Sequence, residues 1–154
     1  MPSHVFNLIA SAVARRNGDL LLVQQQGPDD PHPYWWLPSG QVELGEGLLA
    51  GLAREVLEET GLTVVGTPTI AFVVQVLRHR GEGLQQWFVC HFACEVAGNL
   101  GPQDPDGLIV SAHWVQEQVA LEHLGKNSDY DCEPLHRWLC GEAAPGAVYT
   151  VKIN

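Results

Sequence analysis

Basic residues, cysteines and long apolar runs are all scarce in this chain, and each shortage excludes a class of protein. Eight lysines and arginines stand against 18 aspartates and glutamates, which gives a formal net charge of −10. Such a charge opposes binding to long nucleic acids and to anionic membranes, so neither is an expected partner. No stretch approaches the roughly 18 apolar residues of a membrane helix, and residues 1–7 lack the features of a signal peptide. The composition therefore predicts a cytoplasmic protein.

The four cysteines do not form the close pairs of a zinc site or a dense disulfide framework. We therefore expect reduced residues that pack against apolar neighbours. The seven histidines share no metal-ligand spacing and are expected at surface or strand positions. With 154 residues, 45% of them hydrophobic, the chain is sized for a single domain, residues 1–154, whose core needs no disulfide or structural metal.

The hydrophobic pattern predicts strands around one strongly periodic helix. Residues 5–14 and 20–24 are apolar runs separated by a turn at Asn17 and Gly18, so two adjacent strands are expected. Strands that flank helices indicate an α/β protein, with a mixed sheet covered on both faces. The other expected elements are a hairpin, a strand, a second helix and a terminal strand, at residues 69–79 with 85–96, 109–115, 132–139 and 148–153.

The segment from Leu48 to Gly61 has helical periodicity, with carboxylates gathered on one side. Glu55, Glu58 and Glu59 fall within an arc of about 100° on the helical wheel, away from the apolar half. Carboxylates at this spacing repel one another unless a cation neutralises them. An all-oxygen site of this kind suits Mg²⁺ or Mn²⁺, which share phosphate oxygens with a substrate. Taken alone, the pattern fits an acidic, solvated helix face better.

The spacing of residues around this helix is more specific than its charge. A glycine, a glutamate and an Arg-Glu pair are separated by five and seven residues, and the pattern then continues to a final Gly-Leu. It resembles the complete Nudix box, and a random window would match it at a rate on the order of 1 in 10 billion. The residues at the box positions are Gly40, Glu46, Arg54, Glu55, Val56, Glu58, Glu59, Gly61 and Leu62.

Resemblance to the Nudix hydrolase family implies a Nudix-type α/β/α sandwich with a mixed sheet. It also implies that Glu55, Glu58 and Glu59 hold Mg²⁺ or Mn²⁺, with the backbone carbonyl of Ser39 completing the shell. Ser39 departs from the glycine that the family commonly has at this position, which affects the loop conformation more than the carbonyl. On the helical wheel Arg54 lies about 40° from Glu58, so it can orient Glu58 or pair with Glu46. An ordinary surface salt bridge explains Arg54 nearly as well, and the two roles can be the same contact.

The general base differs between members of the family, and two kinds of candidate are present here. One is Glu55 itself. The other is a carboxylate from a later loop, for which Asp104 and Asp106 in the flexible segment 98–107 are available. Ordinary turn residues are an equally good interpretation of both aspartates.

Residues outside the box are the expected source of substrate selection. Gln24 opens a run of three glutamines at residues 24–26, and Arg78 and Arg80 end one arm of the predicted hairpin. These side chains and Asp106 are the candidates for contact with phosphate or base. Solvated strand ends explain the glutamines better, and explain the arginines about equally well.

Four aromatic residues are candidates for stacking on a nucleobase, namely Tyr34, Trp35, Trp36 and Trp87. Core packing is the expected role of at least two of them. A further pattern, Asp131 just before the second helix, is best explained as capping of that helix.

The function implied by the resemblance is hydrolysis of a phosphoanhydride bond in a nucleoside diphosphate linked to another moiety, by water attacking phosphorus. The substrate is then a nucleotide-derived small molecule, such as a nucleotide sugar or a dinucleoside polyphosphate. A nucleoside triphosphate pyrophosphohydrolase is the alternative enzyme, and a non-catalytic Nudix-fold nucleotide sensor is the alternative from another class. The resemblance also allows a homodimer.

Overall fold

The structure is a computed structural model that describes residues 4–128 and 130–154. The first three residues of the N-terminal segment therefore lie outside the described part of the chain. The elements are β1 (Val5–Val13), β2 (Arg15–Arg16), β3 (Asp19–Gln25), β4 (Tyr34–Trp36), β5 (Ser39–Gln41), α1 (Leu48–Thr60), β6 (Thr63–Arg80), β7 (Gly83–Ala97), β8 (Ile109–Gln116), α2 (Glu117–Gly125), α3 (Glu133–Leu139) and β9 (Ala147–Ile153).

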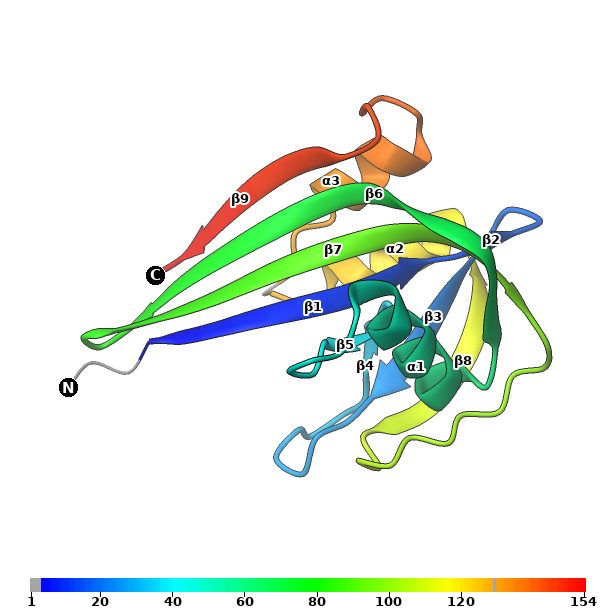
Figure 1. Cartoon of the computed structure of the whole chain (residues 1–154), viewed down its shortest axis with the longest axis horizontal. Helices are drawn as coiled ribbons and strands as arrows, with labels where there is room; N and C mark the ends of the chain where they lie inside the picture. The colour runs from blue at the N-terminus through cyan, green and yellow to red at the C-terminus, as the bar shows by residue number, and fades with distance from the viewer. Residues whose placement is uncertain (1–3, 129) are drawn as a thin grey trace.

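The strands are divided between two sheets. A five-stranded sheet has the order β5-β1-β7-β6-β9, and a four-stranded sheet joins β2, β3 and β4, with β8 paired to β3. The larger sheet is mixed, because β1 and β7 run parallel while β6 and β7 form an antiparallel hairpin. Helix α1 lies on one side of this sheet, and α2 and α3 lie on the other (Figure 1). The predicted α/β class with a mixed sheet is confirmed.

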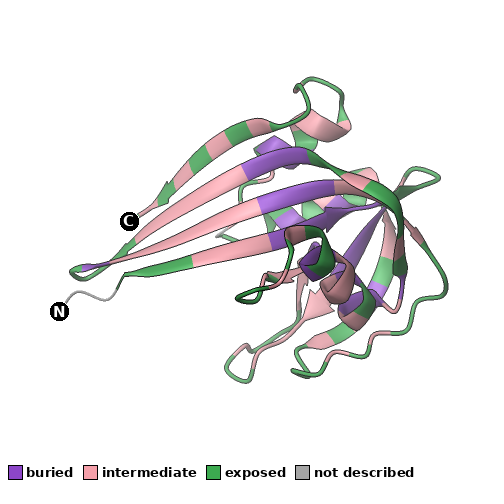
Figure 2. Ribbon diagram, in the orientation of Figure 1, coloured by how far each residue is buried: buried purple, intermediate pink, exposed green. Residues whose placement is uncertain are grey.

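Each side of the larger sheet has its own hydrophobic core. On one side Leu52 and Val56 of α1 pack against Ala10, Ala12 and other buried residues, and the small alanine side chains leave room for the helix. The other core contains residues of α2, α3, β3 and β6. Figure 2 shows that the most buried stretches of β1, β6 and β7 lie where helices cover them, while the far half of the β6–β7 hairpin extends beyond the helices.

The turn at Asn17 and Gly18 is present, with both residues at positive φ (52° and 81°). The prediction that it joins two adjacent long strands is wrong, because the turn connects β3 to the short strand β2. β1 instead pairs in parallel with β7 from Val5 to Val13. β1 is apolar on both faces, so it fits a central position between two helix layers.

Helix α2 was not expected from the sequence. Only Ala120 and Leu124 are buried in it, while Val119 remains 40% exposed, so its amphipathic pattern is weak. The other predicted elements are present, but β6 begins at Thr63 rather than at residue 69. α3 and the terminal strand β9 each differ from the prediction by one residue at their N-terminal end. The predicted N-cap role of Asp131 is wrong, because the N-cap of α3 is Cys132, whose side chain makes no capping hydrogen bond. Asp131 instead accepts a hydrogen bond from the backbone N–H of Glu133 at 3.0 Å, two residues along the chain, in the turn that enters the helix.

All four cysteines are free. Cys90 is buried, and burial raises the pKa of the Cys94 thiol to about 11, which fits packing residues. Cys140 is exposed, with its Sγ 3.4 Å from Nε2 of His136, so the packing prediction is wrong for this residue. Within residues 4–128 and 130–154, no helix has both the length and the apolar character needed to cross a membrane.

Candidate active site

The C-terminal end of α1 fixes the position of the acidic residues. Gly61 ends the helix at φ 77°, and its N–H donates to the carbonyl of Leu57, which confirms the predicted cap. The loop after β7 satisfies two further carbonyls, since the N–H of Gly101 donates to Thr60 at 2.9 Å and that of Gln103 to Glu58 at 2.8 Å. These bonds hold the loop against the acidic end of the helix.

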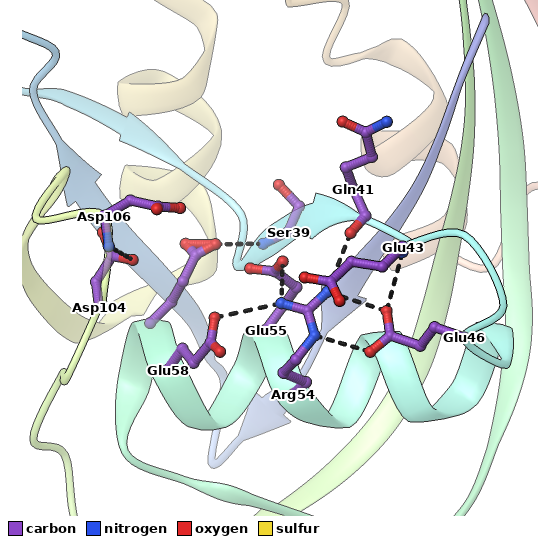
Figure 3. A network of polar contacts seen from close by, with 10 residues as sticks. Ser39, Gln41, Glu43, Glu46, Arg54, Glu55, Glu58, Asp104 and Asp106 are labelled. Carbon is purple, nitrogen blue, oxygen red and sulfur yellow. Dashed lines mark hydrogen bonds and ion pairs between the residues drawn. The ribbon is translucent and has the colours of Figure 1, made fainter.

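Arg54 joins three glutamates of the box (Figure 3). Its Nε and Nη2 donate to Glu46 at 2.8 and 3.0 Å, and its Nη1 donates to Glu55 at 2.8 Å and to Glu58 at 3.3 Å. Nη2 also donates to the carbonyl of Gln41. Both predicted contacts of Arg54 therefore occur together. The guanidinium lowers the pKa of the Glu46 carboxyl to about 2, while Glu46 raises the pKa of Arg54.

Glu59 is the most deeply placed of the three carboxylates of the box helix. It is only 4% exposed. Its Oε1 accepts a hydrogen bond from the backbone N–H of Ser39 at 3.1 Å, and its Oε2 has no partner within the described residues. Burial raises the pKa of this carboxyl to about 9, and the charges of Glu55 and Asp104 add to the effect. An ionised carboxylate here needs a cation to compensate for its lost hydration.

The carboxylate of Glu55 lies directly against Gly40. A Cβ atom placed on Gly40 would stand 2.0 Å from Cδ of Glu55, so only glycine leaves room for the carboxylate in this position. Burial raises the pKa of Glu55, and the contact with Arg54 opposes that shift. The box spacing between Gly40 and Glu55 thus has a direct steric reason.

The donor set fits a hard divalent cation. Glu55, Glu58 and Glu59 provide only oxygen ligands, and the partnerless Oε2 of Glu59 is a buried acceptor without a donor. No group of three His, Cys, Asp or Glu side chains converges at metal-binding distance in the described part of the chain. The reason is visible in the contacts, because Arg54 holds Glu55 and Glu58 while Ser39 holds Glu59. Rotation of side chains on adjacent helical turns would bring the three together.

Asp104 and Asp106 occupy the loop beside this cluster (Figure 3). The carboxylate of Asp104 accepts hydrogen bonds from the backbone N–H groups of Asp106, Leu108 and Ile109 at 2.8 to 3.2 Å, as a turn residue does. Its charge also raises the pKa of Glu55 and Glu59. Asp104 therefore acts on the site electrostatically while its oxygens stabilise the loop.

A cavity of about 350 Å³ opens next to the box, on the face of the larger sheet opposite α1. Ser39 and Gly40 form part of its wall, so it adjoins the acidic cluster. Trp36, Trp87 and Tyr130 supply aromatic surface. The apolar part of the wall comes from side chains of β1, β6, β7 and β9, namely Ile9, Val74, Val76, Val89, Val151 and Ile153.

The residues predicted to contact substrate are only partly gathered at this cavity. Arg78 lines it, with its guanidinium 5.7 Å from the ring of Trp87. Arg80 lies exposed at the hairpin end and is not part of the wall. Gln24 accepts a hydrogen bond from Ser111 at 3.0 Å away from the cavity, while the next residue, Gln25, lines it.

Two of the four predicted aromatic residues line the cavity, and the other two do not. Trp36 and Trp87 line the cavity. Trp35 stacks on His123 with ring centroids 4.7 Å apart and packs against the core, and Tyr34 accepts a hydrogen bond from Gln25. Of these four residues only Trp35 packs against a core cluster, whereas the sequence predicts at least two packing residues.

Four residues of the wall with polar side chains are not among the site residues that the sequence predicts: Ser11, His91, Tyr130 and Asp131. Alternation along β7 places His91 on the same face as Trp87 and Val89. That signal becomes useful only when the parallel pairing of β7 with β1 is known. His91 is 4% exposed, and burial lowers its pKa to about 3, so its imidazole is neutral at physiological pH.

Comparison with known proteins adds an independent observation. The family model described as NUDIX domain matches residues 6–135. The chain is 32% identical over 111 residues to "Putative nudix hydrolase 1" of Caenorhabditis elegans, and 26% identical over 115 residues to the CTP pyrophosphohydrolase of Escherichia coli. These matches cover 70% and 75% of this chain. The chain spans 28% of the nematode protein and 79% of the bacterial one.

Solved structures share the fold. A NUDIX hydrolase from Nitrosomonas europaea superposes with a TM-score of 0.73 at 21% identity, over 90% of this chain and 92% of that one. A MutT protein from Bacillus halodurans gives a TM-score of 0.70 at 20% identity, over 96% and 90% of the two chains. At these identities the likeness establishes the arrangement of strands and helices.

Proposed function

The chain belongs to the NUDIX domain family, and from that membership we propose that it hydrolyses the phosphoanhydride of a nucleoside diphosphate linked to another moiety. One observation supports the proposal: Glu55, Glu58 and Glu59 share the C-terminal half of α1. Glu59 is buried there, Glu55 lies against Gly40, and Arg54 contacts both Glu55 and Glu58. The cavity begins at the same residues. A binding module would have no need of so costly a cluster of carboxylates.

Glu55, Glu58 and Glu59 would hold Mg²⁺ or Mn²⁺, together with the backbone carbonyl of Ser39. When bound, such an ion lowers the pKa of a water ligand and offsets the charge that builds on the phosphate oxygens. The chain itself supplies the geometry. The N–H of Ser39 orients the carboxylate of Glu59, and Gly40 leaves the space that Glu55 needs.

Arg54 is proposed as a positioning residue for the carboxylates. Its Nη1 donates to both Glu55 and Glu58. Its Nε donates to Glu46, and this bond fixes the orientation of the guanidinium toward the other two carboxylates. Glu55 is one candidate for the general base, because its carboxylate lies in the acidic cluster against Gly40 and beside Arg54. Asp104 uses its oxygens on three backbone N–H groups, which leaves Asp106 as the candidate from the loop.

The cavity is proposed to receive the nucleoside part of the substrate. Its aromatic wall of Trp36, Trp87 and Tyr130 suits a flat ring, and Ser39 and Gly40 connect it to the acidic cluster. Arg78 and Gln25 are the polar candidates for contact with substrate at its wall. Arg80 and Gln24 lie away from the wall, and we retain them only as candidates for contact with a longer substrate.

A nucleoside triphosphate pyrophosphohydrolase is a second candidate function. It is favoured by one relative, the CTP pyrophosphohydrolase of Escherichia coli, since the match covers 79% of that protein. Two structural neighbours, an ADP-ribose pyrophosphatase from Streptococcus suis and a UDP-X diphosphatase, are named for substrates in which a nucleoside diphosphate is linked to another moiety. A nucleotide sensor is disfavoured, because no acidic position of the box is replaced.

The composition and the family resemblance support proposals on domain number, compartment and partners. We propose that residues 1–154 act as one domain in the cytoplasm on a small nucleotide-derived substrate, without nucleic acid or membrane as partner. The net charge of −10 supports the last two points. A homodimer is proposed on resemblance alone.

The direct test is turnover of a panel of nucleotide sugars, dinucleoside polyphosphates, coenzyme derivatives and nucleoside triphosphates, with products separated by chromatography. Each substrate is incubated with Mg²⁺, with Mn²⁺ or with excess chelator. We expect turnover only with a divalent ion, and a loss of at least about 100-fold in Glu58→Gln. The exposed Glu122→Gln on α2 serves as the matched control and should behave as the parent. No turnover across the panel would favour the sensor, and near-normal activity of Glu58→Gln would remove the box from catalysis.

A further inference from the structure

One row of residues crosses the larger sheet from the box to the bottom of the cavity. Ser39 on β5 stands opposite Ser11 on β1, Ser11 stands opposite His91 on β7, and His91 stands opposite Phe72 on β6. Neighbouring strands lie about 4.8 Å apart, so His91 is roughly 10 Å across the sheet from Ser39. All four residues line the cavity.

His91 is a polar side chain in a place that apolar residues otherwise fill. It is 4% exposed, and its Nδ1 has no hydrogen-bond partner among residues 4–128 and 130–154. Its ring lies on Phe72, with centroids 4.3 Å apart and planes 24° from parallel, so the imidazole has a fixed orientation. A buried nitrogen without a hydrogen-bond partner has lost its hydration with no compensating bond. That cost indicates a partner from outside the chain.

The neighbours of His91 limit what this partner can be. Val74 and Val89 are cross-strand partners on the same face of the sheet as His91. Trp36 and Tyr130 also line the cavity, with ring centroids 5.1 Å apart. Because burial lowers the pKa of His91 to about 3, the ring offers one neutral donor and one neutral acceptor. It therefore suits an uncharged group with hydrogen-bonding atoms along its edge. A phosphate or a carboxylate would be desolvated there without a compensating charge.

We infer that His91 is a specificity-determining residue, whose imidazole hydrogen-bonds the edge of an uncharged heteroaromatic ring of the substrate. The inference rests on the proposed function and deepens it. It also defines the orientation of the bound substrate: the nucleobase lies over His91, and the phosphates lie toward Ser39 and the acidic end of α1. The other moiety of the substrate then points out of the cavity.

The test measures binding without turnover, so that it is independent of hydrolysis. AMP, GMP, CMP, UMP and base-free ribose 5-phosphate are titrated by calorimetry into the full chain and into His91→Phe, which keeps a ring and removes both nitrogens. We expect at least one nucleotide to bind the parent at least about tenfold more tightly than ribose 5-phosphate, because only it can use the imidazole. His91→Phe should lose that preference, while its affinity for ribose 5-phosphate changes less than about twofold.

Two further variants separate hydrogen bonding from packing. His91→Gln retains a neutral donor and acceptor and should recover part of the preference. His113→Phe carries the same change at an exposed histidine that is not part of the wall, and should bind as the parent does. Equal nucleotide affinity in His91→Phe and the parent would overturn the inference, as would a parent that binds no nucleotide better than ribose 5-phosphate. Failure of the proposed function appears separately, as nucleotide binding without hydrolysis of any substrate in the panel.

Discussion

Replacing Glu59 with glutamine should stabilise the fold when no cation is present. The pKa of the buried carboxyl is raised from 4.5 to about 9, so folding favours its protonated form. Its contribution to stability is therefore complete below about pH 4.5 and is lost as the pH rises toward about 9. At about pH 7.5 the cost to the parent is on the order of 2 to 4 kcal/mol, since each pKa unit corresponds to about 1.4 kcal/mol. Glutamine keeps the acceptor for the N–H of Ser39 and carries no charge.

Divalent cations should make the parent more stable than Glu59→Gln. A cation that binds the folded parent stabilises it by about 2.7 kcal/mol at 100 times its Kd. Glu59→Gln lacks the charged ligand and should gain little. The free energy of unfolding is measured by urea denaturation between about pH 4.5 and 9, in chelator and in Mg²⁺ or Mn²⁺, with the parent, Glu59→Gln and the exposed control Glu122→Gln.

The parent and Glu59→Gln should differ in opposite directions in chelator and in divalent cation. In chelator the parent loses stability with rising pH, and Glu59→Gln loses less. In Mg²⁺ or Mn²⁺ the parent regains stability and Glu59→Gln does not. If Glu59→Gln proved no more stable than the parent in chelator at about pH 7.5, the assigned burial cost of this carboxylate would be wrong.

Three further substitutions test the local geometry. Gly40→Ala should lower kcat/KM at least about tenfold, because its Cβ takes the place of the Glu55 carboxylate, while Gly47→Ala, with open space around it, should be tolerated; equal activities would refute the steric argument. Gly61→Val should cost at least about 1 to 2 kcal/mol of unfolding free energy, because φ is 77° and its Cβ would lie 2.5 Å from the carbonyl oxygen of Gly101; an unchanged melting temperature would contradict this. His91→Phe should make the free energy of unfolding less sensitive to acid between about pH 6.5 and 3. In this range the parent should lose up to about 1.4 kcal/mol per pH unit, because only its unfolded state protonates this histidine. If the unfolding free energies of the two proteins fell in parallel, His91 would not be a buried neutral ring.

The parts of the site that the sequence predicts are local in the chain. Helix α1 and its cap at Gly61 follow from 3.6-residue periodicity and a terminal glycine, both of which lie within one segment. The contact of Arg54 with Glu46 and Glu58 also depends on residues at most eight positions apart. Their geometry is largely determined by the helix and the turn before it.

The cavity could not be predicted, because it depends on pairing between distant segments. β1 and β7 are parallel neighbours although about 80 residues separate Ser11 from His91. Gln25 lines the cavity and Gln24 does not, and the pairing of β3 with β8 shifts register between these two residues. A one-residue change reverses the face of a side chain, and no local signal in a run of three glutamines indicates it.

Hydrolysis in oxygen-18 water reports which bond of the substrate is broken. We propose that a divalent cation and an attacking water lie at the acidic end of α1, with the phosphates of the substrate between this site and His91. One heavy oxygen should therefore appear in a phosphate-containing product, on the same product with Mg²⁺ or Mn²⁺, and turnover should stop in excess chelator. Heavy oxygen on the sugar or another alcohol fragment would mean carbon–oxygen cleavage, and full turnover in chelator would mean catalysis without the cation; either result would contradict the account.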